Sequence, residues 1–287
     1  MSSSKCARKF IRAILISIAA LLLYAFGAPL SSSFDFVILG DRTGEAQDHV
    51  YERVWAELAT EKPAFVLSVG DTIQGMDDAT AQQEWRSVSQ TLARYRAIPL
   101  FLTPGNHDIW STSSEALFRK YAKHPPHYSF DYRQMHVTVL DNSRSETFSA
   151  EEIGFLENDL KAHAAQPLKF VVSHRPSWLM QALFSNPNSR FHQIVKRYGV
   201  QYVIAGHIHQ MLHFELDGIT YLSMPSAGGH LRASKRYEDG WFFGHTKVEV
   251  RGTKLQMKIE ECRPPQGKGR VTTPDDWGTA GLRRKAA

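Results

Sequence analysis

The chain has 287 residues, of which 43% are hydrophobic and 22% charged, with a formal net charge of +5 and only two cysteines. This length is enough for one large domain that needs no disulfide support, and two cysteines exclude a disulfide framework. The positive charge lies at the ends: residues 1–28 contribute +4 and residues 263–287 contribute +4, which leaves about −3 for residues 29–262. A central region of that charge is a poor general binder of nucleic acid, so no nucleic-acid partner is expected.

The N-terminal segment has the layout of an export signal. Residues 2–12 are polar and basic, residues 13–26 are almost entirely apolar, and the small residues Ala25 and Gly27 precede a cut before Ala28. The apolar stretch is short for a membrane span, which needs about 20 residues. We therefore predict a cleaved signal peptide over residues 1–28 and a periplasmic or extracellular protein. The alternative is an uncleaved signal anchor over residues 11–28, which is the only membrane contact expected.

From residue 34 onward, short β-type runs alternate with amphipathic segments. Strands are predicted over residues 34–40, 64–69, 98–103, 134–140, 168–173 and 201–205. Helices are predicted over residues 46–60 and 79–96, after the capping box Ser149–Glu152, and over residues 191–198. After His209 the pattern predicts only strands, over residues 211–216, 220–224, 241–250 and 254–259.

This order of elements predicts two sheets packed face to face with helices outside, in a domain spanning residues 29–262. The segment 263–287 is basic, rich in Pro and Gly, and without apolar periodicity, so we predict a disordered tail.

Five of the short apolar runs end on a residue that can hold a metal ion. In chain order these residues are Asp41, Asp71, Asn106, His174 and the pair His207 and His209. Ligands of α/β folds gather at the carboxyl ends of strands, so the sequence predicts a metal centre assembled from the whole chain. Six other histidines are expected to be ordinary surface or core residues: His124, His127, His136, His163, His192 and His245.

The residue types also suggest the metal chemistry. Asp71 is suited to bridge two cations, because a carboxylate has two oxygens. Asp41 would serve one ion, and Asn106 and His174 the other. A His-x-His pair on a strand would face opposite ways, so His207 and His209 require a loop. Oxygen and nitrogen donors without thiolate suit Mn, Fe or Zn.

The ordered motifs resemble those of the calcineurin-like metallophosphoesterases of bacterial type. They are Asp41-Arg42-Thr43, Gly70-Asp71, Gly105-Asn106-His107-Asp108, His174 and Gly206-His207-Ile208-His209. The resemblance covers residues 34–260 and implies a four-layer α/β/β/α sandwich of two mixed sheets flanked by helices. It also implies two metal ions: Asp41, Asp71 and His209 would hold the first, and Asp71, Asn106, His174 and His207 the second. His107 would contact phosphate and assist the leaving oxygen, oriented by Asp108.

The sequence departs from this family at Thr43, where many members have a metal-binding histidine. Purple acid phosphatases, a branch with some similarity to this chain, also lack it and use a tyrosine three residues after the bridging aspartate. That position is Gln74 here. Gln74 either coordinates the first ion through its carbonyl oxygen or bonds a metal-bound water, and the pattern leaves both open.

The resemblance implies an exported hydrolase of small phosphate esters, in which a hydroxide shared by two metal ions attacks phosphorus. Monoester and diester substrates are not separable from the sequence. Arg42 and Arg175 either grip the substrate or support the metal loops. The alternative function is a non-catalytic module that keeps the fold with a weakened first metal site and binds a phosphorylated ligand or a cell-envelope partner.

Overall fold

The computed structural model describes residues 33–263, 267–273 and 276. The predicted signal peptide or anchor lies outside this range. Within the described residues, no helix combines the length and apolar character that crossing a bilayer requires.

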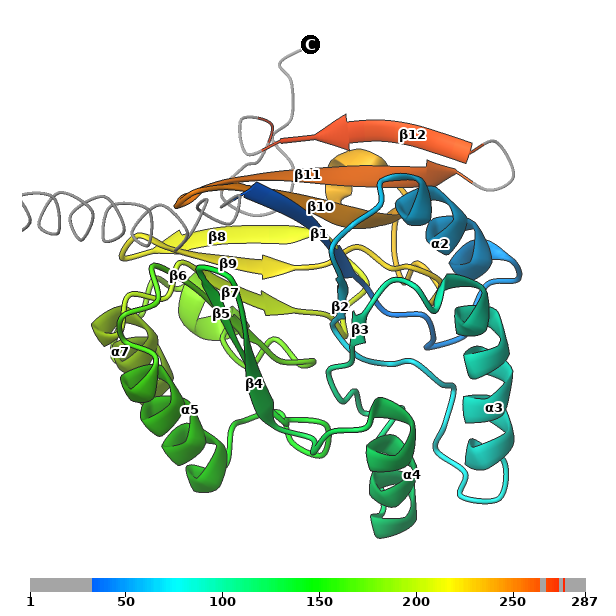
Figure 1. Cartoon of the computed structure of the whole chain (residues 1–287), viewed down its shortest axis with the longest axis horizontal. Helices are drawn as coiled ribbons and strands as arrows, with labels where there is room; N and C mark the ends of the chain where they lie inside the picture. The colour runs from blue at the N-terminus through cyan, green and yellow to red at the C-terminus, as the bar shows by residue number, and fades with distance from the viewer. Residues whose placement is uncertain (1–32, 264–266, 274–275, 277–287) are drawn as a thin grey trace, which may run out of the picture. The chain divides into compact units, whose positions relative to one another are not determined.

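Two six-stranded mixed sheets form the centre of the described domain (Figure 1). The first sheet has the order β12-β11-β10-β1-β2-β3 and the second has the order β4-β5-β6-β7-β9-β8. The strands of the first sheet are β1 (Ser33–Leu39), β2 (Val66–Ser68), β3 (Leu100–Phe101), β10 (Phe243–Arg251), β11 (Lys254–Arg263) and β12 (Gly267–Thr272). Those of the second are β4 (Tyr128–Tyr132), β5 (Met135–Val139), β6 (Leu168–Val172), β7 (Tyr202–Ala205), β8 (Leu212–Leu216) and β9 (Ile219–Ser223).

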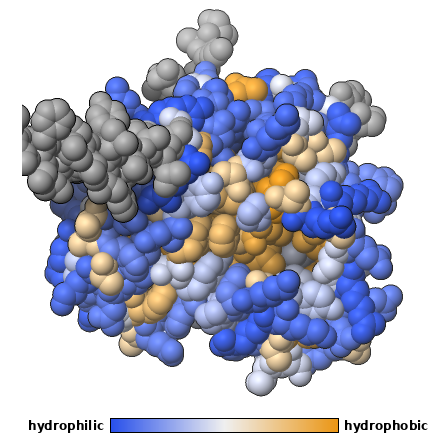
Figure 2. Space-filling view, viewed as in Figure 1, coloured by the Kyte–Doolittle hydropathy of each residue, from blue (hydrophilic) through white to orange (hydrophobic). Residues whose placement is uncertain are grey.

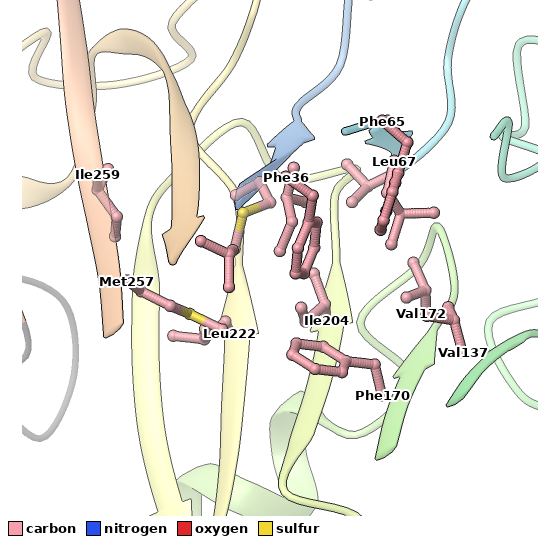
Figure 3. Packing of buried hydrophobic residues seen from close by; sticks show 14 of the residues in the cluster. Phe36, Phe65, Leu67, Val137, Phe170, Val172, Ile204, Leu222, Met257 and Ile259 are labelled. Carbon is pink, nitrogen blue, oxygen red and sulfur yellow. The ribbon is translucent and has the colours of Figure 1, made fainter. Parts of the chain in front are cut away.

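The main hydrophobic core lies between the two sheets. Strand β1 shows how the sequence builds it, because alternate side chains point to opposite faces. Phe36 and Ile38 enter the inter-sheet core, whereas Val37 and Leu39 pack in a separate cluster with helix α2 (Val50–Thr60). Figure 3 shows Phe36 of β1 and Phe65, which directly precedes β2, facing Phe170 and Ile204 of the second sheet. Both faces of β1 are therefore buried, which explains its nearly continuous apolar run.

Helices cover the outer faces of both sheets and complete a four-layer α/β/β/α arrangement. The first sheet carries α2, α3 (Ala81–Leu92), the short 3₁₀ helix η1 (Ala93–Tyr95) and α4 (Thr112–Ala122). The second sheet carries α5 (Ala150–Ala162), α6 (Leu179–Leu183) and α7 (Arg190–Arg197). A further 3₁₀ helix, η2, spans Tyr237–Asp239. The predicted fold class is confirmed.

The edge strands β3 and β4 meet at one side of the sandwich. The rings of Phe101 in β3 and Phe130 in β4 stack with their centroids 3.9 Å apart. Figure 2 shows a hydrophobic area in the middle of this face, over the junction of the two edge strands. Aromatic stacking thus closes the side of the core that strand pairing leaves open.

Several elements differ from the sequence prediction. Helix α4, strand β4 and helix α6 were not predicted, and the predicted strand 98–103 contracts to two residues between Pro99 and Pro104, which lack N–H donors. The capping box at Ser149 is only half formed: the Ser149 hydroxyl accepts the Glu152 N–H at 3.1 Å, but the Glu152 carboxylate accepts from the Asp141 N–H instead.

The predicted disordered tail is wrong over residues 267–272. This segment forms β12, which pairs with β11 at the edge of the first sheet. Arg270 fixes the pairing, since its Nε donates to Glu261 at 3.1 Å and its guanidinium lies over the Tyr237 ring. A polar segment with two glycines becomes a strand here because its neighbour supplies the hydrogen bonds.

Candidate metal centre

The loops that follow the strands bring the predicted ligands together in two overlapping groups. In the first group, Asp41, Asp71 and His209 offer ligand atoms within 4.8 Å of one another. In the second, Asp71, His174 and His207 do the same. The side-chain oxygen of Asn106 lies 3.0 Å from Nε2 of His174, which places it beside the second group. Asp71 is common to both groups, as a bridging ligand must be.

The first group has the chemistry that a cation requires. Oδ2 of Asp41, Oδ2 of Asp71 and Nε2 of His209 are all buried and have no hydrogen-bond partner among the described residues. Buried polar atoms are almost always paired, because leaving one unpaired costs about 1–3 kcal/mol. Three such atoms in one cluster of ligand-type side chains fit a metal ion.

Backbone carbonyls fix two of the three imidazoles that would bind the ions. Nδ1 of His209 donates to the carbonyl of His230 at 2.8 Å, so Nε2 is left for the first group. Nδ1 of His174 donates to the carbonyl of Val69 at 2.9 Å, and its Nε2 faces Asp71 and Asn106. Orientation of a histidine ligand through its other nitrogen is the usual support in metal sites. Sequence patterns do not identify such carbonyl partners, because any residue type supplies them.

The ligand loops have a backbone conformation that is rare for these residue types. Asp71, His207 and His209 have φ angles of 55°, 70° and 61°, in the left-handed region. Such conformations cost about 1–3 kcal/mol each and cluster at functional sites. The predicted loop at His207 and His209 is thus present. The backbone at Gly206 also packs closely against a potential ligand, because a Cβ on Gly206 would lie 2.6 Å from Oδ2 of Asp41.

Without an ion, protons balance the charge of the buried acids. Burial raises the pKa of Asp41, with Asp71 adding repulsion. Burial opposes ionisation of Asp71 as well, but His174 and His107 outweigh it and lower its pKa to about 2. Burial would lower the pKa of His174, yet the Asp71 carboxylate raises it to about 9. His207 has its pKa lowered to about 3 by burial and by the charge of His174. In the metal-free protein a charged His174 thus faces the Asp71 carboxylate, while His207 stays neutral.

Gln74 lies beside the first group but is already engaged. Its side-chain oxygen accepts from the hydroxyl of Thr43 and, at 3.3 Å, from the backbone N–H of Glu45. This arrangement favours a role in bonding the loop that carries Thr43 over coordination of the first ion. Among the described residues, the first group would then offer three protein ligands to an ion, and the second would offer four with Asn106.

His107 is close to both groups, but Asp108 does not orient it. Nδ1 of His107 donates to the backbone carbonyl of Gln74, which leaves Nε2 as the atom available to a substrate. Asp108 is fully buried, and its oxygens accept from the backbone N–H groups of Thr72, Ile73 and Gly105. The prediction that Asp108 orients His107 is therefore wrong. Asp108 instead joins the loop after β2 to the loop after β3.

The two neighbouring arginines differ in their surroundings. Arg42 donates to the carbonyl of Thr72 at 3.2 Å and lies over the Tyr51 ring, as a loop support would. Arg175 has Nη1 3.4 Å from Nε2 of His207 and pairs with Glu146, whose side chain is 74% exposed. Arg175 is thus next to the second group, held by a carboxylate that can move away. Glu146 was not predicted, because it lies in a loop with no motif.

Comparison with known proteins identifies the class of this chain. A family model described as calcineurin-like phosphoesterase matches residues 34–211, more than half of the chain. The chain belongs to the calcineurin-like phosphoesterase family and is a hydrolase acting on phosphoric ester bonds. Members of the family bind divalent metals, in agreement with the two groups of ligands.

Curated proteins similar to this chain include the 3',5'-cyclic adenosine monophosphate phosphodiesterases CpdA from two strains of Escherichia coli. Each is 27% identical over 203 residues, which cover 66% of this chain and 69% of the relative. Among solved structures, a purple acid phosphatase from yellow lupin (Lupinus luteus) superposes with a TM-score of 0.62 at 15% identity, over 85% of this chain and 54% of that one. A dimetal phosphatase from Danio rerio gives 0.56 at 12% identity, over 84% and 98%. These structures share the fold.

Proposed function

We propose that the protein is a dinuclear, metal-dependent phosphoesterase that hydrolyses small phosphate esters. The observation that carries this proposal is the pair of ligand groups that share Asp71, with three buried ligand atoms left unpaired. Asp41, Asp71 and His209 would hold one ion, and Asp71, Asn106, His174 and His207 the other. When bound, the two ions would supply an activated water and neutralise phosphoryl charge.

The protein residues then position the ester and manage the proton. Nδ1 of His107 donates to the Gln74 carbonyl, so Nε2 can donate a proton to the leaving oxygen when the ring carries a second proton. Arg175 beside His207 supplies a positive charge for a non-bridging phosphoryl oxygen once Glu146 moves away.

A cyclic nucleotide is the first substrate to test, since the CpdA relatives are named for cyclic AMP hydrolysis. We propose assays of the purified full-length chain with 3',5'-cyclic AMP, a chromogenic phosphodiester and a chromogenic phosphomonoester, each with Mn, Zn or Fe. Turnover that requires added metal, together with at least two bound ions per chain, is expected. Absence of turnover of all three esters, with fewer than one ion per chain, contradicts the proposal and favours a non-catalytic binding module.

Export is proposed from the sequence of residues 1–28. Its test is the mass of the mature N-terminus in the cell envelope or medium of the producing organism. Cleavage before Ala28 supports a signal peptide, and an intact N-terminus in the membrane fraction supports a signal anchor. Recovery only from the cytosol, with an intact N-terminus, contradicts export.

A further inference from the structure

A separate cluster of potential ligands lies on the outer face of the first sheet, under helix α2. Glu61 is the C-cap residue of α2, His245 lies in β10, and Glu260 is directly opposite His245 in β11. His245 also pairs with Leu39, whose side chain belongs to the cluster packed against α2, so His245 faces the helix. One ring nitrogen of His245 and one oxygen from each glutamate lie within 4.8 Å of one another.

The hydrogen bonds within this cluster leave buried atoms unpaired. Nε2 of His245 lies 2.7 Å from Oε1 of Glu61, and these side chains are 0% and 7% exposed. Oε2 of Glu61 and Nδ1 of His245 are buried without a hydrogen-bond partner among the described residues. An ion pair alone therefore leaves one acceptor of Glu61 unsatisfied, at a cost of about 1–3 kcal/mol.

The surrounding cations do not remove this deficit. Lys247 feels the charge of Glu61, but its Nζ lies between two carboxylates of its own, 3.5 Å from Asp35 and 3.4 Å from Glu249. Lys268 is 3.7 Å from Glu260 and is 58% exposed. Two carboxylates thus face a histidine that contributes at most one positive charge, and an exposed lysine that can turn away.

We propose that Glu61, His245 and Glu260 bind a divalent transition-metal ion such as Zn²⁺, independently of the candidate metal centre. Two carboxylates and a neutral imidazole match the +2 charge, and nitrogen and oxygen donors bind Zn²⁺ at about 2.0–2.2 Å. Donors around a tetrahedral ion lie about 3.4 Å apart, so ligand atoms within 4.8 Å of one another need to approach by up to about 1.4 Å, which glutamate side chains allow. The ion would hold the end of α2 against β10 and β11.

Cys262 lies nearby but does not act as a ligand. It is buried on the same face of the sheet, and burial together with Glu57 raises the pKa of its thiol to about 12. Its Sγ is not among the potential ligand atoms of this cluster that lie within 4.8 Å of one another. The site therefore has three protein ligands and leaves a position for water.

The test counts zinc bound to the full-length chain after equilibrium dialysis, by elemental mass spectrometry. Both His245→Gln and Glu260→Gln are expected to bind one zinc ion per chain fewer than the wild type. His192→Gln serves as the matched control, because His192 is equally buried and bonded to Tyr221 and Asp217. This control is expected to keep the full count.

The Glu260→Gln variant tests the proposal even if His245→Gln does not fold. The Glu260 side chain is 15% exposed, so the substitution is expected to leave the fold intact. Added zinc should raise the melting temperature of an Asp71→Asn chain and not that of Asp71→Asn with Glu260→Gln. Equal zinc counts in the wild type and in folded Glu260→Gln overturn the proposal. Phosphoesterase activity of Glu260→Gln is expected to be unchanged, so failure here is distinct from failure of the proposed function.

Discussion

Asp71 belongs to both groups of potential ligands, and its surroundings explain why a bridging carboxylate fits here. Its Oδ1 accepts the backbone N–H of His107 at 2.9 Å, while its Oδ2 is buried without a partner among the described residues. The backbone therefore orients Oδ1, which keeps a second lone-pair site, and Oδ2 is unpaired, so both oxygens can face a cation. This hydrogen bond holds the side chain in place before any ion arrives.

His174 provides a prediction about protons. Both of its ring nitrogens face acceptors, and its pKa is raised to about 9, so the ring is charged at pH 7 in the metal-free protein. A metal ligand must be neutral, so binding should release about one proton per chain at pH 7 and less as the pH rises through 9. Calorimetry in two buffers of different ionisation enthalpy measures this release. The same release at pH 7 and pH 10 would contradict the assignment.

Gln74 provides a second prediction at this scale. Its oxygen is occupied by Thr43 and Glu45, so Gln74→Ala should leave the number of bound ions per chain unchanged. Thr43→Val, which removes the hydroxyl partner without adding a donor, is the matched control. Loss of one ion in Gln74→Ala alone would show that Gln74 coordinates the first ion.

At this scale the sequence predicts which residues approach one another, because each potential ligand ends an apolar run. It does not predict that Asp108 bonds to backbone N–H groups or that the His230 carbonyl orients His209. These contacts use backbone atoms, which every residue type carries, so no pattern of side chains indicates them.

At the scale of elements, the loops after β2 and β3 act as one unit because Asp108 joins them. Burial raises the pKa of Asp108 to about 7 and the nearby Asp71 adds to the effect, although three N–H groups donate to it. Positive φ at Asp71 and the short strand β3 leave these loops with little regular structure of their own. The carboxylate of Asp108 replaces the missing ladder bonds.

Asp108→Asn tests this role. The amide directs N–H groups at backbone donors, so at least one buried bond is lost, and the free energy of unfolding should fall by about 1–3 kcal/mol. Urea unfolding measures the change. Asp78→Asn is the control, because Asp78 is exposed and accepts from the Ser111 hydroxyl. Equal stability of Asp108→Asn and the wild type would contradict the joining role.

Elements with strong apolar periodicity were predicted within a few residues, as β1 and α5 show. Strands β4 and β12 were not, because their residues are partly polar and their pairing is decided by neighbours. In β12 the decisive contacts come from Glu261 in β11 and Tyr237 in η2, which are remote from any local pattern.

At the scale of the whole described domain, a second buried histidine lies between carboxylates far from the metal loops. His136 of β5 is fully buried, with Nδ1 2.7 Å from Asp131 and Nε2 2.9 Å from Asp159, and its ring stacks on His163. Burial lowers its pKa, but the two carboxylates outweigh burial and raise it. The pair of acids therefore stabilises a buried imidazolium.

This arrangement predicts a pH dependence of stability. Because the folded pKa of His136 exceeds the ordinary value of about 6.5, its contribution is complete below pH 6.5 and is lost as the pH rises through the folded pKa. Urea unfolding over this range should show a steeper loss of stability in the wild type than in His136→Gln. Parallel profiles for the two proteins would exclude His136 as the source.

The layered architecture was predicted because element order limits how sheets and helices pack. The order of strands within each sheet was not predicted, because strands remote in the sequence, such as β1 and β10, pair with each other. The same pairing places His245 beside Glu61 and Glu260, although the sequence pattern predicts only a surface or core histidine at this position.

A metal centre bridged by Asp71 is tested most directly by comparing the wild type with Asp71→Asn for bound metal and for hydrolysis of the phosphate ester that the wild type turns over. Because Asp71 belongs to both ligand groups, the variant should lose most of the metal bound at the candidate metal centre and at least ~100-fold in activity. Asp78→Asn should retain both. Activity of Asp71→Asn equal to that of the wild type, with the metal content unchanged, would contradict a centre bridged by Asp71.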